Sequence, residues 1–316
     1  MSTYLQDLTL RLATGISLLP EEVRSCHTHY LLESQSEDGG FRGRMGEESD
    51  LYYTSFGLRG LSILGALYGE PADRAAKFLS SQLGTHQTIV DFFSLFYAAN
   101  LLKISAGIDI FAGSDPSWRR QIGEFLARLK RPDGGYAKAP EGHAGSTYHT
   151  FLVMLVLQLI DHPIAEPESI ISFLRGQQAE GGGWREIRAS KRAGTNPSAA
   201  AFASLRMIDS VSDETRELTI DFLCEMQTDE GGLRANTRIP IADMLSSFTG
   251  GLTLQDMNAF GEIDVDLYQR FVNSLQLPGG GFLAAVWDEV HDVEYTFYGL
   301  GCMALIENHR VDQRIG

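Results

Sequence analysis

A short phrase of the form Gln-x-x-x-Gly-Gly-aromatic recurs along the chain at an almost constant interval. Full, altered or degenerate copies of this phrase begin at Gln35, Gln82, Lys130, Gln178, Gln227 and Gln276. Successive copies are separated by 47, 48, 48, 49 and 49 residues. A period of this length indicates one structural unit repeated six times, in which each unit buries its apolar face against its neighbours.

Each repeat contains two segments with helical character. The segment before the glycines has one apolar stripe at helical spacing, as in residues 118–129. The segment after the glycines is apolar nearly all round, as in Thr150–Ile160 and Thr296–Ile306, which indicates burial on both sides. Side-chain oxygens that can cap a helix N-terminus stand at Ser114–Pro116 and Ser212–Glu214, so we expect helices to begin there.

The paired glycines predict a sharp turn between the two helices. In Asp38–Gly40 and Glu230–Gly232 they supply the positive φ angles that reverse the chain, and the aromatic residue that follows can plug the rim. Six amphipathic helices and six fully apolar helices bury all their apolar faces if the second set forms an inner ring and the first an outer ring. We therefore predict an all-α fold, an (α/α)6 toroid or barrel of helical hairpins. It is predicted as a single domain over residues 1–316, with a short N-terminal helix and a C-terminal tail.

Charge and composition limit the class of partner. The 316 residues carry 26 Lys and Arg against 41 Asp and Glu, a formal net charge of −15, which repels nucleic acid and anionic membrane surfaces. Three cysteines without a Cys-x-x-Cys pair are typical of reduced thiols. The N-terminus has no signal-like apolar core, and the longest apolar run, Phe151–Ile160, is too short to cross a bilayer. We expect a cytoplasmic protein without a transmembrane segment or nucleic-acid partner.

The repeat resembles that of protein prenyltransferase β subunits and class II (squalene-hopene-type) terpenoid cyclases, in which Gln-x-x-x-Gly-Gly-aromatic precedes an inner helix. The resemblance extends from about Glu22 to Glu307. It implies a deep, aromatic-lined cavity for isoprenoid chains, with the chemistry at the starts of inner helices. The predicted substrate is therefore an isoprenoid small molecule.

In the zinc-dependent prenyltransferases, the metal ligands are an Asp and a Cys two residues apart and a His that directly precedes a Thr in the last repeat. The matching positions here are Asp243, Leu245 and Tyr295. Hydrocarbon and neutral phenol are poor zinc ligands, so we predict no zinc and no metal site. A magnesium ion that accompanies a bound diphosphate stays compatible with the sequence. Asp243 is either a catalytic residue or a helix N-cap.

The cyclase motif Asp-x-Asp-Asp-Thr is similar to Asp292–Thr296, which follows Gly280–Phe282. The resemblance places Glu294 at the position of the proton donor, with Tyr295 in place of the final Asp. Asp292 would hold or tune the proton, because neighbouring carboxyl groups raise each other's pKa. The alternative is that both acids merely favour the helix start.

Aromatic residues in the same register predict a lined cavity mouth, although core packing explains them equally well. His149 is either a cavity residue or a structural histidine. The predicted lining residues are Tyr52, Tyr148, His149, Trp184, Phe248, Trp287, Tyr295 and Phe297, with Tyr53 nearby.

Two loops are basic in this acidic chain. In the resemblance, such loops bind the prenyl diphosphate, and forked guanidinium groups suit that ligand. The alternative is a solvated surface loop. The candidate diphosphate-binding residues are Arg185, Arg188, Lys191, Arg192, Arg234 and Arg238, with Arg42 and Arg44 as weaker candidates in the first repeat.

Together these features favour a zinc-independent isoprenoid enzyme that acts on a prenyl diphosphate or prenylated small molecule by carbocation chemistry, through cyclisation or prenyl transfer. Two alternatives stay open. One is a prenyltransferase-like β subunit that needs an α-type helical partner, or that forms a homodimer. The other is a non-catalytic toroid that binds lipid. Fold analogy carries most of this functional prediction.

Overall fold

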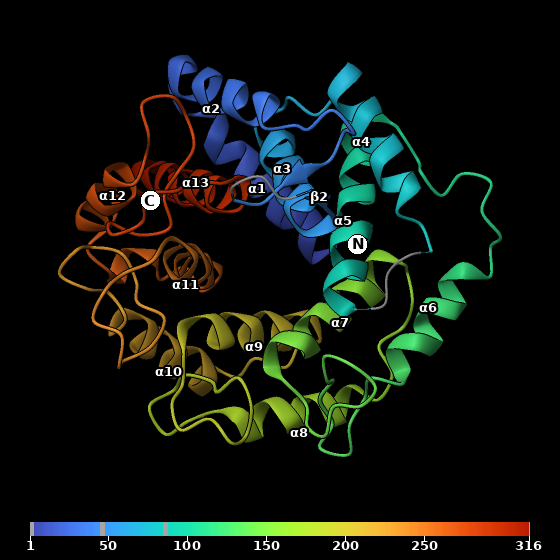
Figure 1. Cartoon of the computed structure of the whole chain (residues 1–316). Coiled ribbons are helices and arrows are strands. Elements are labelled where there is room, and N and C mark those ends of the chain that lie inside the picture. The colour runs from blue at the N-terminus through green and yellow to red at the C-terminus, as the bar shows by residue number, and fades with distance from the viewer. Residues whose placement is uncertain (1–2, 45–47, 85–87, 316) are drawn as a thin grey trace. The chain divides into compact units, whose positions relative to one another are not determined.

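The computed structural model describes residues 3–44, 48–84 and 88–315, which fold mostly into helices (Figure 1). The chain divides into two compact units, Met1–Ser114 with Val272–Gly316, and Asp115–Phe271. Unit 1 contains α1 (Tyr4–Ser17), α2 (Glu21–Glu33), β1 (Phe41–Arg42), β2 (Ser49–Asp50), α3 (Leu51–Ile63), α4 (Gly69–Ser81), α5 (Ile89–Ala106) and α13 (Val293–Ile315). Unit 2 contains α6 (Trp118–Ala127), α7 (Thr147–Leu159), α8 (Pro167–Gln177), α9 (Thr195–Met207), α10 (Asp213–Cys224), α11 (Met244–Asp256) and the 3₁₀ turn η1 (Phe260–Glu262). The division between the units falls within α12 (Val265–Ser274), after Phe271.

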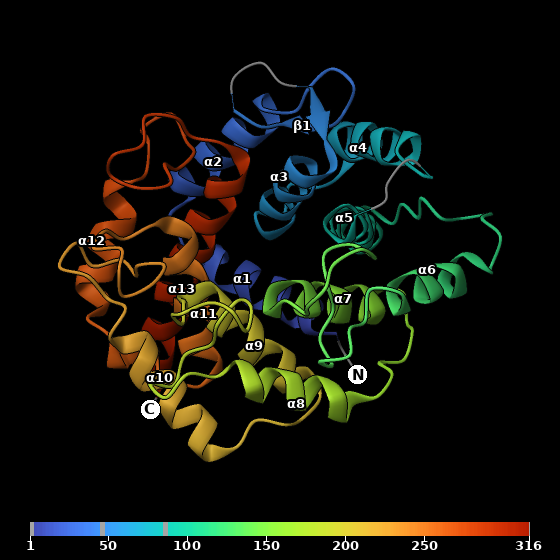
Figure 2. The ribbon, with the colours of Figure 1, turned by 60° about the horizontal axis from the view of Figure 1, so that its bottom comes forward.

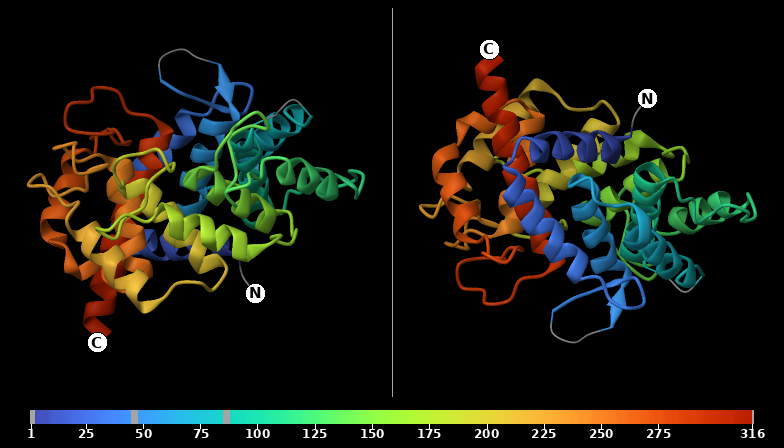
Figure 3. Two further views of the ribbon diagram at one scale, coloured as in Figure 1. Left: turned by 90° about the horizontal axis from the view of Figure 1, so that it is seen from below. Right: turned by 90° about the horizontal axis from the view of Figure 1, so that it is seen from above.

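Unit 1 is built around the apolar helix α3. This helix packs against α5 on one side and α13 on the other, and α1 packs along both α13 and α3. Figure 1 and the right-hand view of Figure 3 show α1 beside α13. The amphipathic helices α2 and α4 pack against α3 and α5 respectively. Leu58 and Leu61 are completely buried as a result.

Unit 2 repeats the same arrangement. The apolar helices α7, α9 and α11 pack in succession, α8 contacts both α7 and α9, and α10 packs on α11 (Figure 2). The prediction that amphipathic helices alternate with helices apolar on all sides is therefore confirmed in both units. The all-α toroid fold class predicted from the repeats is correct.

The glycine pair is required by close approach as well as by turn geometry. Gly39 has φ +90°, and a Cβ there would collide with the Arg74 carbonyl of the next amphipathic helix. A Cβ on Gly40 would lie 2.8 Å from the Phe78 ring of that same helix. The glycine turn is thus the contact surface between one repeat and the next.

The other two elements of the repeat hold this turn in place. The Gln35 Nε2 atom donates to the carbonyls of Gly39 and Pro71, at 2.9 and 3.0 Å. The Phe41 amide donates to Thr54 Oγ1 at 2.8 Å, and the aromatic residue of the phrase is completely buried. The same amide-to-hydroxyl bond recurs 14 residues apart at Tyr136 and Thr150, Trp184 and Ser198, Leu233 and Ser247, and Phe282 and Thr296.

Three local predictions need correction. Asp115 bonds the Ser117 amide, and α6 begins at Trp118 rather than at 114–116. The predicted C-terminal tail is helical, because α13 continues to Ile315. A short antiparallel strand pair, β1 with β2, forms in the first repeat, where extended residues lead into α3. The predicted cap at Ser212 is confirmed, since its side chain accepts from the Thr215 amide at 3.1 Å.

Within unit 1, helix α2 contacts the glycine turn of the sixth repeat. A Cβ on Gly280 would lie 2.7 Å from the Cys26 carbonyl. His27 is completely buried, accepts from the Gly281 amide at 3.1 Å through Nδ1 and stacks on Phe282 with ring centroids 4.9 Å apart. Burial lowers the pKa of His27 to about 4, so the imidazole is neutral.

Helix α5 is the one described helix that is long and apolar enough to cross a membrane by length and composition. The apolar run Phe151–Ile160 singled out in the sequence forms the greater part of the shorter helix α7 and ends at its C-cap, Ile160. Just over half of the α5 window, 56%, is buried inside the protein, as is typical of a core helix packed between α3 and α4.

Candidate functional site

Polar side chains gather in unit 1 where α3 and α13 begin. Each helix starts with a capping carboxylate: Asp50 Oδ1 accepts from the Tyr53 amide at 2.7 Å, and Asp292 Oδ1 accepts from the Tyr295 amide at 2.9 Å. Because α3 and α13 pack together, the side chains of their first turns meet.

Glu294 lies at the centre of this group and is only 8% exposed. Its Oε1 atom accepts a hydrogen bond from the Tyr52 hydroxyl at 2.7 Å and a longer one from the Tyr298 hydroxyl at 3.4 Å. Its Oε2 atom accepts no hydrogen bond from the described residues. Burial raises the pKa of Glu294, and the charge of Asp292 adds to that rise, against opposing effects of Tyr52, Tyr298 and Arg59.

Asp292 forms an ion pair with an arginine from the first repeat. Arg44 Nε donates to Asp292 Oδ2 at 2.9 Å, and Arg44 Nη2 lies 2.8 Å from Asp288 Oδ2. Burial opposes the charge of Arg44, but the two carboxylates outweigh it and raise the pKa of the guanidinium. Asp292 therefore caps α13 and forms an ion pair with Arg44, and its charge raises the pKa of Glu294. Arg44, a weak candidate for diphosphate binding, is engaged by carboxylates.

Aromatic rings surround the Glu294 carboxyl group. The Tyr52 and Phe56 centroids are 5.0 Å apart, and Phe56 lies 5.3 Å from Tyr298 and 5.8 Å from Phe297. Tyr52 and Phe297 were predicted as lining residues, whereas Phe56 was missed. Phe56 follows Tyr52 by four positions, the helical spacing that could have revealed it.

Tyr53 and Tyr295 stand beside this group, in the first turns of α3 and α13. Burial, followed by the charges of Asp292 and Glu294, raises the pKa of Tyr53 to about 12. The Arg44 guanidinium lies 5.2 Å from the centroid of the Tyr295 ring, a cation–π contact that shields the Asp292 ion pair. Tyr295 thus stacks against an arginine at the place where the zinc-dependent relatives carry a histidine.

Arg59, one helical turn beyond Phe56 on α3, was not predicted. It is 7% exposed, and its guanidinium carbon lies 4.2 Å from the centroid of Phe56, 4.7 Å from Tyr97, 5.1 Å from Phe93 and 5.8 Å from Phe297. The available signal was composition, because Arg59 is the one charged residue in the otherwise apolar or neutral segment 51–63.

Asp243, in unit 2, is a helix cap. Its Oδ1 atom accepts from the Ser246 amide at 2.7 Å and its Oδ2 atom from the Ser246 hydroxyl at 2.8 Å, while burial raises the pKa of its carboxyl group. Neither Leu245 nor Tyr295 offers zinc a good ligand. Among the described residues, no three His, Cys, Asp or Glu side chains are grouped so as to hold a metal ion.

The two basic loops of unit 2 lie side by side. Arg192 Nη1 donates to Thr237 Oγ1 at 3.3 Å, and the Thr195 amide bonds the Ala235 carbonyl. Arg185 and Arg234, however, turn back onto carbonyls at the ends of their own repeats' helical segments, those of Gln178 and Glu225. The exposed cations that remain at the two loops are Arg188, Lys191, Arg192 and Arg238.

The other predicted lining residues have structural or surface positions. Trp184 is completely buried, and its indole Nε1 donates to the Leu174 carbonyl at 3.0 Å, so it packs within its repeat instead of lining a mouth. His149 Nδ1 lies 2.7 Å from Ser146 Oγ, and burial lowers its pKa, as in a structural histidine. Phe248 is buried, Tyr148 is 40% exposed and Trp287 is 67% exposed.

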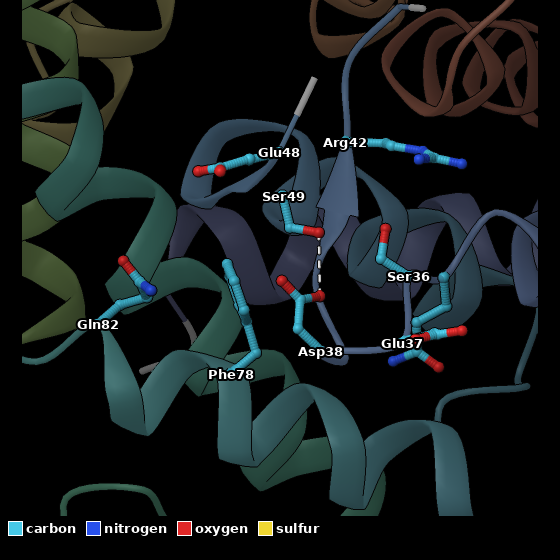
Figure 4. Close-up of a pocket in the computed structure, with 9 residues that line it drawn as sticks. Ser36, Glu37, Asp38, Arg42, Glu48, Ser49, Phe78 and Gln82 are labelled. Carbon is cyan, nitrogen blue, oxygen red and sulfur yellow. Dashed lines mark hydrogen bonds between the residues drawn. The ribbon is translucent and has the colours of Figure 1, made fainter. Parts of the chain in front are cut away.

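A separate surface hollow of about 790 Å³ lies beside β2 and α4 (Figure 4). Among the described residues, the hollow is lined by three carboxylates, Glu37, Asp38 and Glu48, and by one cation, Arg42. Ser49 Oγ donates to Asp38 Oδ1 at 3.0 Å across its floor. An excess of carboxylates is unsuited to a diphosphate, which removes Arg42 from the predicted anion-binding set.

Comparison with known proteins places this geometry in a family. The model of the prenyltransferase alpha-alpha toroid domain matches residues 22–77, 72–191 and 154–315. The fold is similar to that of Candida albicans protein geranylgeranyltransferase-I complexed with GGPP, at TM-score 0.73 and 15% identity over 91% of this chain and 92% of that one.

Two further solved structures share the fold. A variant of the type II terpene cyclase MstE from Scytonema, in complex with geranylgeranyl dihydroxybenzoate, matches at TM-score 0.62 and 12% identity over 96% of this chain and 99% of that one. A glycosidase matches at TM-score 0.56 and 12% identity over 95% and 97%. No curated protein sequence matched. These identities show the fold alone, whereas the family model spans nearly all six repeats, and the chain therefore belongs to the prenyltransferase alpha-alpha toroid domain family.

Proposed function

We propose that this protein is a zinc-independent enzyme that acts on an isoprenoid substrate by carbocation chemistry, with Glu294 as the acid that starts the reaction. One observation carries the proposal: the Glu294 carboxyl group is buried among aromatic rings, its pKa is raised, and one oxygen is free of hydrogen bonds from the described residues. A carboxyl group that keeps its proton to higher pH is what protonation of an alkene requires.

In the proposed step, Glu294 transfers a proton from Oε2 to one carbon of a C=C bond. The π electrons form the new C–H bond and leave the other carbon as a carbocation, while the O–H electrons stay on the Glu294 carboxylate. The Tyr52 and Tyr298 hydroxyls at Oε1 stabilise that carboxylate. A second double bond of the substrate attacks the cation, and the cyclised cation loses a proton to water. Solvent returns a proton to the Glu294 carboxylate, so the overall reaction is an isomerisation.

The surrounding residues suit a cationic intermediate. The Phe56 ring lies within 6 Å of both Tyr52 and Phe297, in edge-to-face and tilted contacts, and a ring face attracts a cation. Asp292 and Arg44 are positioning residues in this scheme. Their ion pair fixes a negative charge two residues before Glu294, where it opposes ionisation of the acid.

The substrate class is supported by what the structural neighbours bind. One is complexed with GGPP and the other with geranylgeranyl dihydroxybenzoate, both of which carry a prenyl chain. Zinc does not fit the residues at the family's ligand positions, because Leu245 has no donor atom and Asp243 is bonded to Ser246 through both oxygens. Protonation by Glu294 therefore accounts for activation better than a metal-bound thiol.

The test is product analysis in deuterium oxide. The purified protein is incubated with geranylgeranyl diphosphate and with prenylated aromatic acids, and products are examined by mass spectrometry. Acid initiation adds one solvent-derived deuterium to each cyclised product, whereas ionisation of a diphosphate adds none at this step. Glu294→Gln should abolish turnover, and the exposed Glu289→Gln should leave it intact. Full turnover by Glu294→Gln, or unlabelled product, would contradict the proposal.

A further inference from the structure

We propose that Arg59 binds an anionic oxygen group, a carboxylate or a phosphate, carried by the ligand of this same site, so that the ligand is an isoprenoid acid or phosphate rather than a hydrocarbon or alcohol. The inference deepens the proposed function and rests on it for the identity of the site. Its foundation is the Arg59 guanidinium, a buried charge that forms no ion pair with any described carboxylate.

Most N–H donors of the Arg59 guanidinium have no acceptor among the described residues. Nη2 donates to Ser55 Oγ at 2.9 Å. Nε is sealed from solvent and has no hydrogen-bond partner. Nη1 also donates no hydrogen bond within the described residues, but unlike Nε it is not sealed from solvent. It is therefore the nitrogen that a ligand can contact. No described carboxylate lies within ion-pair distance of the group.

Cation–π contacts alone leave this charge poorly compensated. A ring face attracts a cation, but it accepts no hydrogen bond in the plane of the guanidinium and carries no net negative charge. Phe56, Phe93, Tyr97 and Phe297 therefore hold the guanidinium without replacing a counter-ion. The Tyr97 hydroxyl is hydrogen-bonded to Thr9 Oγ1 at 3.0 Å and forms no hydrogen bond with the guanidinium. An anion at Nη1 would supply the missing charge and hydrogen bonds.

Arg59 lies on the same face of α3 as Tyr52, which donates a hydrogen bond to the proposed acid, Glu294. Tyr52, Phe56 and Arg59 are spaced by four and then three residues on α3, so they line one side of the helix. Seven residues of helix correspond to about 10 Å along the axis. The proposed ligand thus extends along this face of α3, with its anionic group at Arg59, its double bond at Glu294 and the Phe56 ring between the two.

The charge of Arg59 affects the protonation of Glu294. Glu294 is close enough to Arg59 that the guanidinium charge opposes the rise of the Glu294 pKa. A bound anion would neutralise Arg59 and remove that opposition, so substrate binding would keep the acid protonated. A neutral ligand would leave the opposition from Arg59 in place.

The test compares ligands that differ only in the charged group. Binding of geranylgeranoic acid, geranylgeranyl phosphate and geranylgeraniol is measured by calorimetry with the full chain. We expect at least one of the two anions to bind 10-fold or more tightly than the alcohol, and the pair of anions tells a carboxylate from a phosphate. Equal affinity for all three ligands would overturn the proposal.

Variants separate this outcome from the proposed function. Arg59→Met should remove the preference for the anion while affinity for the alcohol changes little, and Arg59→Lys should keep part of it. Glu294→Gln should keep the anion preference even though it loses turnover, so each proposal fails on its own measurement. Melting curves establish that the variants fold, and if Arg59→Met does not fold, the wild-type ligand comparison still decides. Arg59→Met that weakens acid and alcohol equally would assign Arg59 to core packing.

Discussion

The Tyr52 hydroxyl donates a 2.7 Å hydrogen bond to Glu294 Oε1, and the two residues are separated by 242 positions in the chain. Each stands in the first turn of an apolar helix, at nearly the same position of its repeat. This hydrogen bond favours the ionised form of Glu294, while burial and Asp292 favour the protonated form.

Tyr52→Phe removes the hydrogen bond and should raise the pKa of Glu294 further. Activity that needs a protonated acid is lost as pH rises through this pKa, so the alkaline limb of the pH–rate profile should move to higher pH in the variant. Loss of the bond should cost about 0.5–1.5 kcal/mol of stability. Tyr53→Phe serves as the control, because Tyr53 does not bond Glu294, and an unmoved alkaline limb in Tyr52→Phe would contradict the assignment.

Arg44→Met should unpair Asp288 and Asp292 together. Because Arg44 is one-third exposed, we expect a loss of about 1.5–3 kcal/mol in the free energy of unfolding, the range for hydrogen bonds to charged groups. Arg44 lowers the pKa of Asp288, so its stabilisation is present above the normal carboxyl pKa and fades as pH falls below it. The difference between wild type and variant in urea titrations should therefore shrink near pH 3, and a constant difference would exclude the ion pair as its source.

His27 should make the folded state sensitive to moderate acid. Its pKa is 6.5 when unperturbed and about 4 in the folded protein, so between these values only the unfolded chain binds the proton. The stabilisation is complete above pH 6.5 and up to about 3 kcal/mol is lost as pH falls to 4. His27→Gln should be less stable at pH 7 but should lose less between pH 7 and pH 4. Parallel stability curves for the two proteins would contradict this.

The basic loops of unit 2 give a paired prediction. If these loops hold a diphosphate in addition to the anion site at Arg59, Arg188→Ala combined with Arg238→Ala should weaken geranylgeranyl diphosphate binding about tenfold at low salt. The effect should be smaller at high salt, because both side chains are exposed. Arg185→Ala combined with Arg234→Ala should lower the melting temperature instead, because these side chains bond main-chain carbonyls. Unchanged diphosphate affinity in the first pair would leave those loops as solvated surface.

Native mass spectrometry with metal analysis tests the prediction of zinc independence. Because Leu245 and Tyr295 stand at two of the three ligand positions, protein purified without added metal should contain far less than one zinc per chain. The same spectra would reveal a retained lipid, a homodimer or a helical partner subunit. One zinc per chain that resists a chelator would refute zinc independence.

The repeat architecture could be predicted from the sequence because its determinants are local. Glycine at Gly39 is demanded by a positive φ and by the approach of the next helix, and helical periodicity separates amphipathic from fully apolar segments within a dozen residues. Equivalent positions in successive repeats acquire equivalent surroundings, so the shared register of Tyr52 and Glu294 was visible in the sequence. Helix ends such as that of α13 were less predictable, because polar residues continue a helix as readily as they end it.

The chemistry of the site was decided by tertiary packing. Nothing local pairs Arg44 with Asp292, 248 positions away, nor turns Arg185 onto a carbonyl instead of a ligand. Arg59 is notable in sequence only as a charge in an apolar segment. The packing of α3 with α5 and α13 gives it four rings and no ion-pair partner within the described part of the chain. Local sequence sets backbone geometry and the direction of burial, whereas a charge acquires its partner, and hence its pKa and role, only when distant segments meet.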